Sequence, residues 1–120
     1  MVERLEISGV HMEVGDKLKK YVENKIGRCD RFLPRQHRAD LHAEVKLKQI
    51  KAKDKKHCIC EVVAQLPHET IRIEESTINI YAAVDIVENK LENQFKKYKQ
   101  THGDPKIYRR LGAKFKNSRF

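Results

Sequence analysis

The chain has 120 residues, a length suited to one compact domain, and 39% of them are hydrophobic while 36% are charged. No apolar run approaches the roughly 20 residues of a membrane helix. Residues 1–4 include an acid and no apolar signal core, so a membrane-spanning or secreted protein is not expected. The 26 Lys and Arg exceed the 17 Asp and Glu, and a net charge of +9 favours an anionic partner, nucleic acid before membrane. Three cysteines make a poor disulfide framework and fit a reducing cytoplasm.

The first half of the chain predicts a strand, a helix and a second strand. Residues 4–8 alternate apolar and polar side chains, which is typical of a strand with one buried face. Gly15 and Asp16 open a helix. Its apolar stripe at helical spacing is Leu18, Val22, Ile26 and Cys29, joined by Tyr21. Pro34 and the polar residues 35–38 end this helix, and residues 41–47 alternate again as a strand.

The second half predicts a hairpin, a short strand and a long helix. A charged turn at 51–56 joins the strand at 41–47 to another alternating run at 58–66. A further turn at 67–68 precedes a fourth strand at 70–74. Ser76 or Thr77 is expected to cap the helix, and Gly103 and Pro105 are expected to stop it. The apolar stripe of this helix is Ile80, Val84, Val87, Leu91, Phe95 and Tyr98.

The order β-α-β-β-β-α predicts an α+β fold, a two-layer sandwich of a four-stranded sheet with two helices on one face. The other face is expected to be exposed, as antiparallel sheets tolerate. Residues 1–102 form the expected domain, and residues 103–120 are expected to be a basic C-terminal tail. Residues 102–120 carry six Lys and Arg and one Asp, so +5 of the net charge lies there and +4 in the rest.

Two cysteines on one predicted strand are the main candidates for chemistry. Cys58 and Cys60 face the predicted core, with His42 and His57 nearby, and the alternatives are a zinc site and core packing. Packing is favoured, because structural zinc usually takes four ligands in two separated pairs and free cysteine is often buried. No catalytic or nucleotide-binding motif is present, so we expect no enzyme, no cofactor and no metal.

Basic side chains at helical spacing are better candidates for a binding site: Lys25, Arg28 and Arg31 in the first helix, and Lys90 and Lys97 in the last. Two parallel helices side by side would merge these stripes into one ridge of cations, suited to a phosphate backbone. Ordinary solvated basic residues are the alternative at each single position. Asp85 and Glu88, on one side of the last helix, are expected to be solvated acids.

The last helix also carries a family signature. Residues 79–95, NIYAAVDIVENKLENQF, resemble the second-helix signature of the ribosome hibernation promoting factors. That signature reads Met-Tyr-Ala-Ala-Ile-Asp, then Asp/Asn-Lys-Leu, then Arg-Gln-Leu. The opening Leu5-Glu6-Ile7-Ser8-Gly9 strand, followed by Met12-Glu13-Val14 and a capped helix, is similar too. The resemblance covers about residues 3–101.

The resemblance implies a fold similar to a double-stranded-RNA-binding domain and a non-enzymatic role in inactivating bacterial ribosomes during stationary phase or stress. Members bind the rRNA of the small ribosomal subunit at the decoding region, where tRNA and mRNA would lie. The family's basic helix positions fall on the expected RNA contacts: Lys25, Arg28, Arg31, Lys90 and Lys97. Asn93 stands where relatives carry Arg, and Tyr81 matches a family tyrosine that is equally explained by packing under the sheet.

The chain also departs from the family pattern. Long members carry a second, dimerising domain, for which 120 residues leave no space, so a monomer off the ribosome is expected. One subgroup of short members ends in an acidic tail, whereas this tail is basic and could follow the mRNA path. Two alternatives stay open: a general structured-RNA-binding module of the same fold, and a small enzyme with a cysteine-based or metal site. Promotion of ribosome dimers and silencing of single ribosomes are both compatible with the resemblance.

Overall fold

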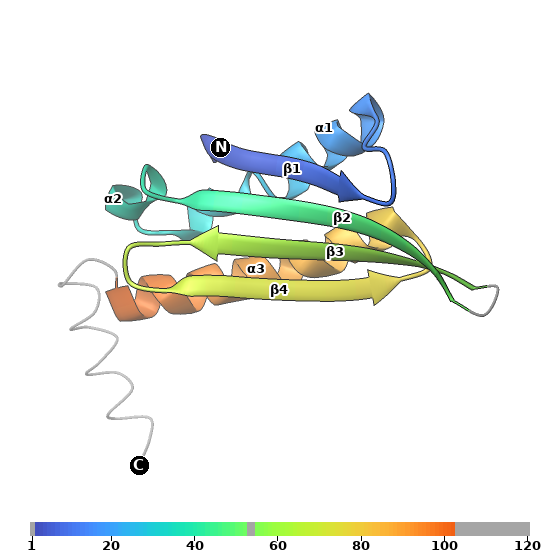
Figure 1. The fold of residues 1–120 in the computed structure, drawn as a ribbon. Coiled ribbons are helices and arrows are strands. Elements are labelled where there is room, and N and C mark those ends of the chain that lie inside the picture. Colours follow the sequence, from blue (N-terminus) through green and yellow to red (C-terminus); the bar gives the residue numbers. More distant parts are fainter. Residues whose placement is uncertain (1, 53–54, 103–120) are drawn as a thin grey trace, which may run out of the picture.

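The computed structural model describes residues 2–52 and 55–102 (Figure 1). Its elements, in chain order, are β1 (Arg4–Val10), α1 (Asp16–Lys25), the 3-10 helix η1 (Cys29–Phe32), α2 (Arg35–Arg38), β2 (His42–Ala52), β3 (Lys55–Gln65), β4 (Thr70–Thr77) and α3 (Ile80–His102). The predicted α+β order of four strands and two longer helices is confirmed. The short elements η1 and α2 stand where we expected the end of the first helix and a polar connection.

The four strands form one sheet in the order β1-β2-β3-β4. β2–β3 and β3–β4 are antiparallel, with Leu47 opposite Cys60 and Val62 opposite Ile73. β1 runs parallel to β2, with Leu5 opposite Ala43, so the sheet is mixed rather than antiparallel throughout. The reason is the connection, because α1 carries the chain back across one face of the sheet before β2 begins.

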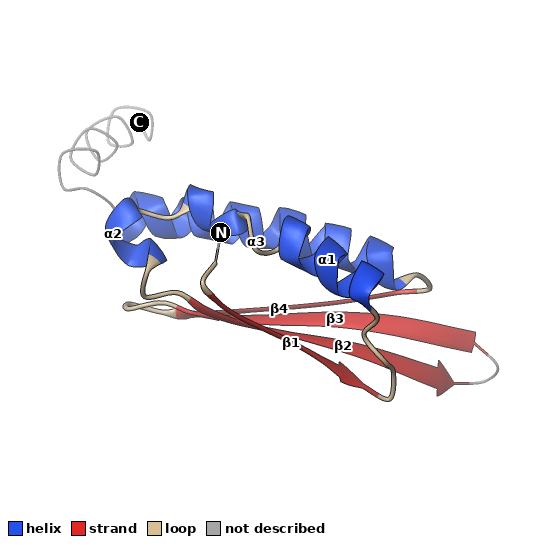
Figure 2. Ribbon diagram, turned by 90° about the horizontal axis from the view of Figure 1, so that it is seen from above, coloured by secondary structure: helices blue, strands red, loops and turns tan. Residues whose placement is uncertain are grey.

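Both long helices cover the same face of the sheet and lie side by side (Figure 2). Strand residues that point toward them are buried, and so are the two apolar helix stripes. The largest fully buried side chains are Tyr98, Phe95, Ile26, Leu33, Leu41, Leu47, Leu91, Val22, Val45, Val62, Val84 and Val87. Cys58 and Cys60 are free and buried, as the core-packing interpretation predicted, and burial raises the pKa of the Cys60 thiol to about 12.

All four strands are longer than predicted. β1 extends to Val10, and β2 and β3 extend into the expected turn at 51–56. β4 continues to Thr77, which pairs with Cys58 and lies two residues before the cap position; its Oγ1 accepts a 3.1 Å hydrogen bond from the backbone N–H of Asn79. Asn79 caps it instead, because its Oδ1 accepts a 2.8 Å hydrogen bond from the backbone N–H of Tyr81. The predicted helix stops at Gly103 and Pro105, and the tail at 103–120, lie outside the described residues.

Candidate nucleic-acid interface

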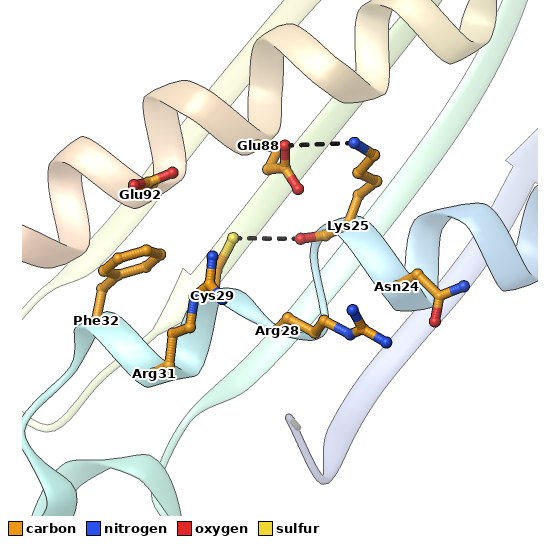
Figure 3. Close-up of a pocket in the computed structure, with 8 residues that line it drawn as sticks. All are labelled: Asn24, Lys25, Arg28, Cys29, Arg31, Phe32, Glu88 and Glu92. Atoms are coloured by element: carbon orange, nitrogen blue, oxygen red, sulfur yellow. Dashed lines mark hydrogen bonds and ion pairs between the residues drawn. The ribbon is translucent and has the colours of Figure 1, made fainter.

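The first set of predicted basic residues lines a groove between α3 and the segment that runs from α1 into η1 (Figure 3). The cavity has a volume of about 220 Å³. One wall carries cations and an aromatic ring, and the other wall carries two carboxylates of α3. The lining residues are Asn24, Lys25, Arg28, Cys29, Arg31, Phe32, Glu88 and Glu92.

The secondary structure that carries these cations differs from the prediction. We expected Lys25, Arg28 and Arg31 to share one helix, but α1 ends at Lys25 and η1 begins at Cys29. Arg28 is the exposed residue before η1, and Arg31 lies within it. The turn and the 3-10 helix nevertheless bring all three side chains to the same groove.

Hydrogen bonds, one of them from a distant part of the chain, stabilise the turn at which the helix ends. The backbone N–H of Val2 donates to the carbonyl of Gly27 at 2.8 Å, so the chain before β1 holds the turn. The N–H of Cys29 donates to Ile26 O at 3.1 Å, and Cys29 Sγ lies 3.4 Å from Lys25 O. These contacts satisfy carbonyl groups that the end of a helix leaves without partners.

Lys25 is embedded in a network that joins α1 to α3. Its Nζ lies 3.8 Å from Asp85 Oδ1 and 3.9 Å from Glu88 Oε1. The hydroxyl of Tyr21 donates to Asp85 Oδ1 at 2.5 Å, and this hydrogen bond, together with burial, raises the pKa of Tyr21 to about 12. The two acids are therefore partners of Lys25 and Tyr21, and the expectation that they are merely solvated is wrong.

Phe32 provides an apolar surface in the groove, which no pattern in the sequence predicted. Its ring is half-buried, and the Arg31 guanidinium lies 4.8 Å from the ring centroid. Lys96 Nζ lies 5.0 Å from the same centroid and 3.1 Å from Glu92 Oε1. The sequence could have placed Glu88 and Glu92 on the same side of the helix, because residues four apart on a helix project to the same side.

The second set of predicted basic residues lies on the other side of α3. Lys90 and Lys97 line a groove of about 520 Å³ between α3 and β4, together with Arg72 and Asn93. Lys90 also forms an ion pair with Glu75 of β4. The single ridge that we expected from the two helices is therefore not formed, because α3 itself separates the two sets.

Tyr81, in the first turn of α3, packs against the core and also contacts α1. It is half-buried, and its ring meets the ring of Tyr21 edge to face, with centroids 4.9 Å apart. Within residues 2–52 and 55–102, no group of three or more His, Cys, Asp or Glu side chains could hold a metal ion. None of the described helices is both long and apolar enough to span a membrane.

Together the fold and the two grooves describe an α+β domain that presents basic side chains on both sides of its last helix. The chain belongs to the family described as Sigma 54 modulation protein / S30EA ribosomal protein, whose model matches residues 5–102. Two curated relatives, from Staphylococcus aureus (strain COL) and Lactococcus lactis subsp. cremoris (strain MG1363), are each named ribosome hibernation promotion factor. They are 35% and 36% identical to this chain over 96 residues.

Coverage differs between this chain and those relatives. The matched residues are 80% of this chain but only 48% and 49% of the relatives, so the chain spans about half the length of the curated relatives it matches. Among solved structures, the N-terminal domain of Thermus thermophilus Protein Y is 31% identical, with a TM-score of 0.65. The match covers 78% of this chain and 94% of that domain.

A second solved structure supports the fold alone. A ribosomal subunit interface protein from Coxiella burnetii is 23% identical, with a TM-score of 0.63, and the match covers 79% of this chain and 96% of that protein. The more specific likeness to a double-stranded-RNA-binding domain stays a prediction.

Proposed function

We propose that this chain is a ribosome hibernation factor that binds the rRNA of the small ribosomal subunit at the decoding region and inhibits translation under stress or in stationary phase. Its binding excludes tRNA and mRNA, and it catalyses no reaction. The proposal is carried by one observation: Lys25, Arg28 and Arg31 converge on one groove within the part of the chain that matches the family. The names of the curated relatives support the ribosome as partner.

The physical basis of the proposed binding is contact with phosphate groups. Lys and Arg side chains that neutralise phosphates release condensed counterions, which supplies affinity and makes it dependent on salt. The two basic grooves flank α3, so Lys25, Arg28 and Arg31 would contact one stretch of rRNA while Lys90 and Lys97 contact another. Such contacts fix the position and orientation of the protein without reading sequence.

We also propose how the chain is organised into a binding domain and an extension. Residues 1–102 act as the ribosome-binding domain, and residues 103–120 act as a basic extension that adds contacts to RNA along the mRNA path. The chain works in the cytoplasm, where ribosomes are. Occupation of the decoding region blocks translation by steric exclusion.

Co-sedimentation tests the proposal. The purified chain is run on sucrose gradients with bacterial ribosomes and with isolated subunits, in the presence and absence of excess tRNA. We expect comigration with the small subunit that tRNA displaces. Comigration that tRNA does not affect would contradict the decoding region as the site. Absence of comigration at low salt, with retained binding to free structured RNA, would favour the general RNA-binding module instead.

A further inference from the structure

The groove between η1 and α3 contains two acids among its cations, and each acid has a lysine neighbour. Glu88 and Glu92 are one turn apart on α3, and their side chains are 25% and 28% exposed. A carboxylate repels phosphate, so a groove that served the RNA backbone alone would be weakened by two of them. Figure 3 shows both acids on the wall opposite the cations and the ring of Phe32.

Carboxylates in an RNA-facing groove can instead accept hydrogen bonds from a nucleobase. Unstacked bases of single-stranded RNA are recognised along their Watson–Crick edges and by stacking on aromatic rings or Arg planes. Guanine presents two adjacent donors on that edge, N1–H and the 2-amino group, which match the two oxygens of one carboxylate. Adenine, cytosine and uracil each place an acceptor beside their donor, and a carboxylate would repel it.

The other groups in the groove fit the remaining parts of a nucleotide. The Arg31 guanidinium lies over the Phe32 ring, 4.8 Å from the ring centroid, and a base can stack on the guanidinium plane. Lys25 and Arg28 stand at the same groove and can meet the adjoining phosphates. Glu88 is the better acceptor of the two acids, because its lysine neighbour is 3.9 Å away whereas Lys96 lies 3.1 Å from Glu92.

We propose that this groove binds one unstacked guanine of single-stranded RNA, with Glu88 accepting hydrogen bonds from N1–H and the 2-amino group while the base stacks on the Arg31 guanidinium that lies over Phe32. This inference rests on the proposed function in one respect, that the cations of the groove contact RNA. It adds a base-specific contact to binding that would otherwise depend on phosphates alone.

Short RNA oligomers test the pocket directly. Fluorescence anisotropy compares an all-uridine oligomer with oligomers that carry one central guanosine, adenosine, cytidine or inosine. We expect the guanosine oligomer to bind at least about fivefold more tightly than the others, since a bidentate base contact discriminates by about 1–3 kcal/mol. Inosine, which lacks the 2-amino group, should be intermediate, and this comparison needs no variant of the protein.

Two variants test which side chain causes the preference for guanosine. Glu88→Gln should abolish the preference for guanosine and raise the affinity for the all-uridine oligomer, because it removes a carboxylate beside Lys25. Glu74→Gln, a matched change in the groove on the other side of α3, should leave the preference intact. Equal affinity for all oligomers, or a preference that survives Glu88→Gln, would overturn the pocket. If the guanosine preference is not found but the chain still comigrates with the small subunit, only the guanine pocket is refuted. If the preference is found but comigration fails, only the proposed function is refuted.

Discussion

Replacing Arg28 and Arg31 with Ala should weaken binding to the small ribosomal subunit more than replacing Lys25. Each phosphate contact contributes about 0.7–0.9 to the slope of log affinity against log salt, which amounts to about five- to eightfold in affinity near 0.1 M salt. The double variant should therefore lose about 25- to 60-fold and reduce the slope by about 1.4–1.8. Lys25 should cost less than about fivefold, because its ammonium already lies 3.8 and 3.9 Å from two carboxylates.

The measurement is a titration of labelled protein with purified small subunits between about 50 and 200 mM salt. The matched control is Lys46→Ala with Lys48→Ala, which removes the same charge from the face of the sheet that is turned away from the helices. Thermal unfolding of each variant checks that the fold is intact. An unchanged salt slope in the Arg28 and Arg31 variant, or an equal loss in the control, would refute the assignment of this groove to RNA.

Three further predictions concern stability and are checked by urea or thermal unfolding. Phe95→Ala should lower the free energy of unfolding by about 3–5 kcal/mol, because the ring is 1% exposed in the core, and a loss below about 1 kcal/mol would contradict this packing. Asn79→Ala should cost about 1 kcal/mol through loss of the helix cap, whereas Asn79→Asp should retain most of it. Burial and the neighbouring imidazoles of His68 and His102 lower the pKa of His37 below its ordinary 6.5. The unfolded chain then binds the proton more tightly, so stability should be full above about pH 6.5 and fall as the pH drops through the folded pKa. His37→Gln should flatten this dependence, and an unchanged slope would show that other groups cause it.

Local patterns predicted the element types well because they reflect local geometry. Alternation at 41–47 and 58–66 identified β2 and β3, and the stripe from Ile80 to Tyr98 identified α3 with most of its buried face. The boundaries were less accurate where pairing with distant residues decides them. Thr77 looked like a helix cap, but its pairing with Cys58 keeps it in β4 and moves the cap to Asn79.

The end of the first helix could not be predicted from local patterns either. Apolar residues at helical spacing continue from Leu18 to Cys29 and are all buried, so the pattern contains no break. The turn at the break contains a contact that the local sequence does not show, the hydrogen bond from Val2 N–H to Gly27 O. Because Arg28 and Arg31 lie beyond that break, their shared groove follows from the turn and η1 rather than from one helical face.

By itself the sequence determined the charge of this protein, the types of its long elements and the composition of its core, since these depend on residue identity and local periodicity. Only the tertiary structure decided how the charged side chains are grouped. The rotation of α3 about its own axis is fixed by packing against the sheet and α1, and it sets Glu88 beside Lys25 while it turns Lys90 and Lys97 toward β4. The helical repeat gives the angles between side chains on one helix, but it does not say which neighbouring element each side chain faces. For that reason the sequence predicted one ridge of cations, whereas the structure has two grooves.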